Sequence, residues 1–110
     1  MDALALPIHN YLLLMKRSAL LVSERDKANM ILLVTMLGQL DKDIISYNYG
    51  LFDKELEPLE TIAKRYDVQP EVITEIIEKD LHKLAITPEW QMMMQGFSPT
   101  VKQKIGINKV

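Results

Sequence analysis

A chain of 110 residues is long enough for one domain with its own core, and 48% hydrophobic with 25% charged residues is a globular composition. The chain contains no cysteine, which excludes disulfides, thiolate metal sites and cysteine nucleophiles. Its net charge of −2 gives no general attraction to nucleic acid.

The first third of the chain predicts two helices. Pro7 suits the first turn of a helix that runs to about Leu20. Ser23, followed three residues later by Asp26, resembles a capping box and predicts the start of the second helix. This helix is apolar nearly all round from Met30 to Leu37. We therefore expect it to be central in the fold and covered on most sides.

Three further helices are predicted before residue 85. Asp41 is expected to cap a short helix that ends near Gly50. After a charged connector, Pro58 suits the first turn of a fourth helix, and Pro70 suits that of a fifth. The fifth helix continues to Leu84, with apolar residues repeating at helical spacing.

The C-terminal part predicts two short helices. Thr87 and Ser98 each precede a proline, which is the pattern of an N-cap followed by the first helical residue. The helices are expected at 88–95 and 99–105, and the glycines that follow them are placed as stops. The fold class is therefore all-α, a compact bundle of five to seven helices in a single domain, 1–110.

The stretch from Leu59 to Leu84 resembles a helix-turn-helix. Ala63 is the small residue that the motif needs where its helices touch, and Asp67 holds the turn position where glycine is usual. The apolar positions on either side of the turn are held by Ile62, Tyr66, Val68, Ile73 and Ile76. The continuation to Leu84 is similar to the DNA-binding region of bacterial sigma factors and related regulators. The resemblance implies a helix-turn-helix at about 58–84 whose second helix enters the major groove.

The same resemblance implies which residues face the target. On the second helix they are Gln69, Glu71, Thr74, Glu75 and Glu78. Lys64 and Arg65, on the first helix, would touch phosphate. Three of the five positions on the second helix are acidic and none is basic, whereas DNA affinity comes largely from lysine and arginine. A helix-turn-helix used for protein docking or dimerisation is therefore the competing interpretation.

A second candidate surface lies in the C-terminal part, which is rich in methionine and aromatic residues. Its members are Trp90, Met92, Met93, Met94 and Phe97. Three adjacent methionines on a helix must point in different directions, and methionine adapts to irregular partner surfaces. Packing of this segment onto the first two helices of the same chain is the alternative.

No catalytic constellation is visible in the sequence. His82 follows Glu78 by four residues, which offers two metal ligands and no third. The four glycines are scattered and form no phosphate-binding loop. We therefore expect no enzyme activity, no metal site, no cofactor and no small-molecule substrate.

These observations predict a small regulatory helix-turn-helix protein. It would act on DNA or on a protein of the transcription machinery, as a homodimer. The alternative is a protein-binding adaptor or inhibitor, of the kind found among small phage proteins, which uses the acidic helix and the methionine-rich surface. A third possibility is an assembly subunit. The longest apolar stretch is too short for the roughly 20 residues that span a bilayer, and Asp2 is unlike the start of a secretory signal, so we expect a cytoplasmic protein without membrane contact.

Overall fold

A computed structural model describes residues 1–107, and the regular secondary structure in this part of the chain is entirely helical. Its elements are α1 (Leu6–Arg17), the 3-10 helix η1 (Ala19–Leu21), α2 (Glu24–Thr35), α3 (Gln39–Tyr49), α4 (Leu59–Arg65), α5 (Pro70–Ala85), α6 (Pro88–Gly96) and α7 (Pro99–Ile105). The prediction of an all-α fold with five to seven helices is thus confirmed. No helix within residues 1–107 is long and apolar enough to cross a membrane. The end of the predicted 1–110 domain, which includes Lys109, lies outside the described residues.

Side-chain caps start three of the helices, as the sequence predicts. The Ser23 hydroxyl accepts a hydrogen bond from the Asp26 backbone N–H at 3.0 Å. The Thr87 and Ser98 hydroxyls each accept one from the backbone N–H three residues on, at 3.2 Å. The cap of α3 differs, because α3 begins two residues before Asp41 and has Gly38 at its N-cap. Asp41 therefore lies in the first turn of α3 instead of capping it.

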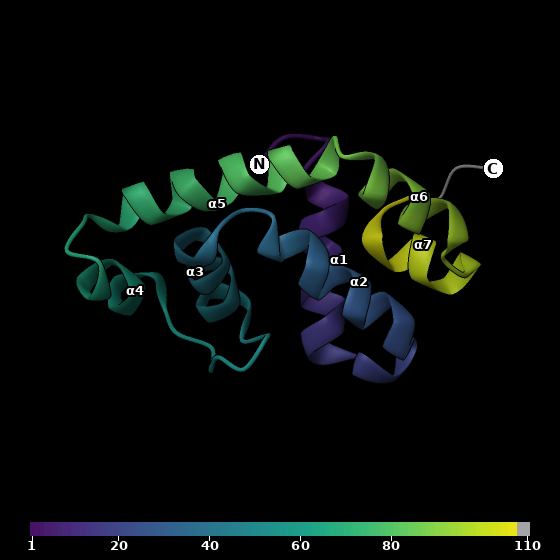
Figure 1. The fold of residues 1–110 in the computed structure, drawn as a ribbon, viewed down its shortest axis with the longest axis horizontal. Coiled ribbons are helices and arrows are strands. Elements are labelled where there is room, and N and C mark those ends of the chain that lie inside the picture. Colours follow the sequence, from purple (N-terminus) through teal and green to yellow (C-terminus); the bar gives the residue numbers. More distant parts are fainter. Residues whose placement is uncertain (108–110) are drawn as a thin grey trace.

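The central helix is α1, which packs against α3, α5 and α7. Figure 1 shows α5 running along the molecule, with α3 and α4 towards one end and α6 and α7 at the other. The buried side of α1 carries Ile8, Tyr11, Leu12, Leu14 and Met15. Because all five are apolar or aromatic and almost fully enclosed, α1 forms the middle of the core.

An aromatic cluster joins α1 to the C-terminal helices. The rings of Tyr11 and Phe97 are stacked, with centroids 4.6 Å apart and an interplanar angle of 12°. Trp90 meets both rings edge-on, at 5.5 Å from Tyr11 and 5.7 Å from Phe97. Such pairs contribute about 0.5–1.5 kcal/mol beyond their buried area. The C-terminal segment is thereby fixed onto α1 of its own chain.

The structure corrects the expectation that α2 is central and covered on most sides. α2 packs mainly against α3 and α6, and only one of its sides is enclosed. Its buried residues are Met30, Leu33 and Val34. Leu32 is 67% exposed and Met36, just after the helix, is 62% exposed. The outer side of α2 is therefore both apolar and uncovered.

A buried carboxyl group lies where α5 faces α3. Asp80 is 1% exposed, and its Oδ2 has no hydrogen-bond partner among the described atoms. Burial, then a hydrogen bond with Asp41 and the negative charge of that residue, raise the pKa of Asp80 to about 7. The charged form of Asp80 is consequently destabilised in the folded protein.

We expect Asp80→Asn to stabilise the folded protein at pH 8 by about 2–4 kcal/mol, since one pKa unit corresponds to roughly 1.4 kcal/mol. Asp80 ionises near 3.8 when unfolded and near 7 when folded. Wild-type stability therefore falls as pH rises from about 4 to about 7, and the whole loss is present above 7. Asparagine has no proton to lose and so never carries the buried charge. Its advantage over aspartate disappears towards pH 4, where Asp80 is neutral. Urea unfolding at pH 4.5 and pH 8 measures the difference.

Glu75→Gln is the matched control, because Glu75 is an exposed acid on the same helix. We expect it to change stability little at either pH. An equal effect of Asp80→Asn at both pH values would contradict the raised pKa of Asp80.

Candidate functional site

α4 and α5 form a helical pair that is joined by a short turn at one end of the molecule (Figure 1). Asp67 in this turn has a φ of 55°, in the left-handed region. The next residue, Val68, donates its backbone N–H to the Ala63 carbonyl at 3.0 Å, which closes the end of α4. Ala63 is 2% exposed, as expected of a small residue at a helix contact. Two helices joined by a short turn are thus present, while their identity as a helix-turn-helix and the likeness to sigma factors stay predictions.

The residues predicted to face a target on α5 differ in their accessibility. Gln69, Glu71 and Glu75 are exposed, whereas Thr74 and Glu78 are half-buried. The Thr74 hydroxyl donates to the Pro70 carbonyl at 3.4 Å. The N-cap residue Gln69 and the first half of α5, with Glu71 and Glu75, are therefore accessible to solvent.

The two basic residues of α4 have different surroundings. Arg65 donates to the Glu57 carboxylate at 2.6 Å, and its guanidinium lies 4.3 Å from the centre of the Tyr47 ring. The hydrogen bond with Glu57 raises the pKa of Arg65 and keeps the arginine charged. Lys64 is exposed and forms no ion pair within residues 1–107. Both predicted phosphate contacts are exposed, and they differ in that Arg65 is paired with Glu57 whereas Lys64 is not paired.

Two valines lie beside the exposed acids of this helical pair. Val68 and Val72 are each 37% exposed, so part of their apolar surface is accessible. Together with Asp67, Glu71 and Glu75 they form what we name the acidic α5 surface. Glu71 and Glu75 are one turn apart and share a side of the helix, and Lys79 is the first basic residue along α5. The surface therefore combines negative charge with accessible apolar area.

The predicted C-terminal surface is divided by the fold. Trp90 and Phe97 are 1% and 7% exposed and belong to the aromatic cluster on α1, so they are not accessible to a partner in this structure. Met93 and Met94 are half-buried. Met92 is 72% exposed. The accessible part of this candidate surface is thus centred on Met92.

Met92 borders a groove between α2 and α6 that sequence reasoning missed. The groove has a volume of about 780 Å³. Its apolar lining consists of Leu32, Leu33, Met36, Met92 and Met93. Arg25 and Glu89 also line it, and we name this feature the α2–α6 groove. An exposed apolar groove of this kind is a candidate interaction site.

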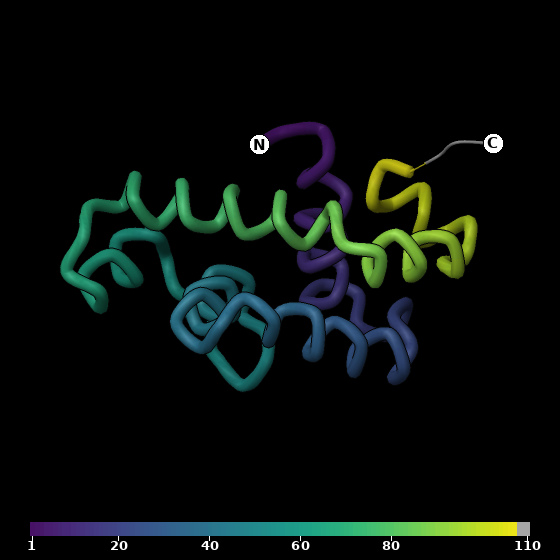
Figure 2. Tube along the Cα trace, turned by 45° about the horizontal axis from the view of Figure 1, so that its top comes forward, coloured from purple at the N-terminus to yellow at the C-terminus, as the bar shows by residue number. Residues whose placement is uncertain are grey.

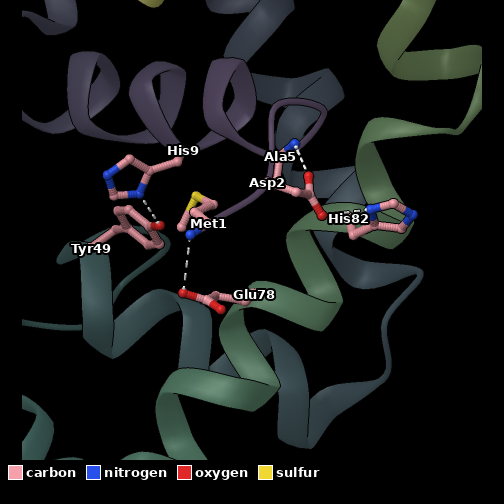
Figure 3. A network of polar contacts seen from close by, with 7 residues as sticks. All are labelled: Met1, Asp2, Ala5, His9, Tyr49, Glu78 and His82. Atoms are coloured by element: carbon pink, nitrogen blue, oxygen red, sulfur yellow. Dashed lines mark hydrogen bonds and ion pairs between the residues drawn. The ribbon is translucent and has the colours of Figure 1, made fainter.

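The N-terminal segment lies against α5, as Figure 3 shows. The Asp2 carboxylate accepts the Ala5 backbone N–H at 2.8 Å and lies 2.9 Å from His82 Nδ1. The Met1 amino group is 3.6 Å from Glu78. His82 and Glu78 thus have separate partners, and within residues 1–107 no group of three potential ligands could hold a metal ion.

A second contact in Figure 3 involves His9, whose Nδ1 is 2.6 Å from the Tyr49 hydroxyl. The two rings meet edge-on at 5.5 Å. Burial lowers the pKa of His9, and the positive charge of Arg17 adds to this effect. Both groups are therefore neutral at pH 7 and link α1 to α3, which is a structural role.

Comparison of the chain with known protein families, with curated proteins and with solved structures finds no match. The two accessible surfaces, the acidic α5 surface and the α2–α6 groove, therefore carry the functional interpretation.

The left-handed turn between α4 and α5 makes the acidic α5 surface sensitive to residue 67. We expect Asp67→Val to lower the free energy of unfolding by about 1–2 kcal/mol, because β-branched residues are strained at positive φ. Asp67→Gly should stabilise slightly or leave stability unchanged, because glycine adopts this conformation freely.

Thermal unfolding followed by circular dichroism measures these effects. Gln69→Val is the matched control, since Gln69 is exposed, extended at φ −76° and ψ 150°, and makes no side-chain cap. If Val at position 67 cost no more than Val at position 69, the left-handed turn would not be the constraint.

Proposed function

We propose that this chain is a small regulatory protein that acts by binding another protein through the acidic α5 surface. The observation that carries the proposal is the pairing of exposed valines with exposed acids on one short helical pair. Val68 and Val72 offer apolar area, and Glu71 and Glu75 flank it with negative charge. Apolar contacts supply affinity in protein interfaces, while complementary charge selects the partner and speeds association.

The chemistry of the surface defines the partner's side of such an interface. It would be a shallow apolar patch bordered by lysine or arginine, presented by a folded protein. The segment from Asp53 to Asp80 contains nine acidic and four basic residues, a balance of −5 that supports this choice. Arg65, one of the four bases, pairs with Glu57, one of the nine acids, so this pair leaves the balance unchanged. The local field therefore favours a basic partner.

Charge reversal on α5 tests this proposal. We expect Glu71→Lys combined with Glu75→Lys to weaken partner binding at least tenfold, because attraction to a basic surface becomes repulsion. The measurement is cross-linking of the tagged full chain in extract of its source cells, with quantitative mass spectrometry of the captured proteins. Any protein so identified is then purified and titrated against both chains at two salt concentrations.

The control variant carries Glu24→Lys and Glu55→Lys, which change the net charge equally at exposed acids outside α5. The proposal requires a protein that the control variant captures and the α5 variant does not. A capture profile that is the same for both variants would contradict the proposal.

DNA binding by α4 and α5 is the second candidate function. It is favoured by the exposed, unpaired Lys64 next to a helix-turn-helix-like turn. On this hypothesis the chain binds random duplex DNA at about 50 mM salt and loses affinity steeply by about 200 mM, since released counterions drive the binding. Fluorescence anisotropy of a labelled duplex measures both.

Lys64→Glu should then weaken DNA binding uniformly across sequences, whereas Lys104→Glu on α7 should not. Lys64 is a better test than Arg65, because changing Arg65 also breaks its contacts with Glu57 and Tyr47. Absence of binding at low salt would rule out DNA as the target.

A further inference from the structure

The α2–α6 groove lies apart from the acidic α5 surface and has a composition of its own. Its apolar centre includes Leu32, Met36 and Met92, which are 67%, 62% and 72% exposed. Leu33 and Met93 form its deeper lining and are more enclosed. The groove therefore offers protruding apolar side chains next to a hollow of about 780 Å³ that could receive such side chains.

The charges at the groove lie at opposite ends. α2 and α6 run in opposite directions in Figures 1 and 2, so the start of one helix lies beside the end of the other. Arg25 is in the first turn of α2, and Glu89 is in the first turn of α6. Both side chains are exposed, and neither forms an ion pair with another of the described residues. One end of the groove is thus marked by a free cation and the other by a free anion.

A second charged residue lies at the Arg25 end of the groove. Asp26 also lines the groove there, but it is half-buried, whereas Arg25 is exposed. Arg25 is therefore the more accessible charge at that end.

We propose that the α2–α6 groove binds the same groove of a second copy of this chain, around a two-fold axis that places Arg25 of each copy opposite the partner copy's Glu89. A two-fold axis through the middle of the groove exchanges its ends, so the cation of one copy meets the anion of the other twice. It also places Leu32 and Met92 of each copy over the partner's hollow. An interface of this kind must be self-complementary, and the opposite charges at the two ends of this surface meet that requirement.

The patch is small for an obligate dimer. Stable interfaces bury roughly 800 Å² on each partner, and the groove alone offers much less surface than that. A reversible equilibrium between monomer and dimer is therefore expected, with a dissociation constant on the order of micromolar. This inference is independent of the proposed function, because the groove and the acidic α5 surface share no residue.

Sedimentation velocity of the full chain over a range of concentrations tests the dimer. We expect the sedimentation coefficient to rise with concentration, and we expect Leu32→Glu combined with Met92→Glu to hold the protein as a monomer. Leu20→Glu is the matched control, because Leu20 is a fully exposed leucine outside the groove. Circular dichroism establishes that each variant remains helical.

A charge exchange identifies the occupant as a second copy. Arg25→Glu alone and Glu89→Arg alone should each weaken the dimer about tenfold, because each creates two like-charge contacts in the symmetric pair. An equimolar mixture of the two single variants should restore dimerisation, since the mixed pair regains both opposite-charge contacts. The chain with both substitutions should also dimerise.

A protein that stays monomeric at every concentration would overturn the inference. So would a dimer that survives the groove substitutions, or a mixture of single variants that fails to restore pairing. If the groove binds a different protein, the groove substitutions should abolish the complex with that protein and leave self-association unchanged. That result would also contradict binding of a second copy.

Discussion

α1 contributes the side chains around which the other helices are arranged, and its enclosure by α3, α5 and α7 fixes where those helices lie. Tyr11 stands at the centre of this arrangement. It stacks on Phe97 and meets Trp90 edge-on, so the last third of the chain is held against the first helix. Loss of this contact would weaken the attachment of α6 to α1, whereas α7 is also held by its own buried residues Val101 and Ile105. The two exposed surfaces depend on the same packing, since it decides which sides of α2 and α5 remain uncovered.

The position of α2 follows from the enclosure of α1. With α3, α5 and α7 against α1, α2 is left to pack on α3 and α6 at the outside of the bundle. Its apolar outer side then faces solvent beside Met92 on α6. Exposed apolar area costs free energy in water, so this arrangement favours association. We infer that a second copy covers it.

α5 combines an internal and an external role along one helix. Its later half carries buried residues, among them Asp80, whose raised pKa reflects how closely α3 encloses it. Its first half extends with α4 to the end of the molecule, where Glu71 and Glu75 are exposed. Glu71 in the first turn also interacts favourably with the helix dipole, so its charge helps to stabilise the helix. In the proposed function this element binds a partner protein, while the groove on the opposite part of the molecule joins two copies.

Local signals in the sequence determined the helices themselves. Helices start at Ser23, Thr87 and Ser98 because these hydroxyls accept hydrogen bonds from free backbone N–H groups. The turn at Asp67 could be predicted because aspartate tolerates a left-handed conformation. Tertiary packing alone decided which apolar side chains are buried. The run from Met30 to Leu37 has no polar stripe that would mark an outer side, so the sequence could not indicate that Leu32 and Met36 are exposed. Trp90 and Phe97 were equally suited to a core or a partner, and only the position of Tyr11 placed them in the core, because an aromatic ring is buried where another element offers it a matching surface.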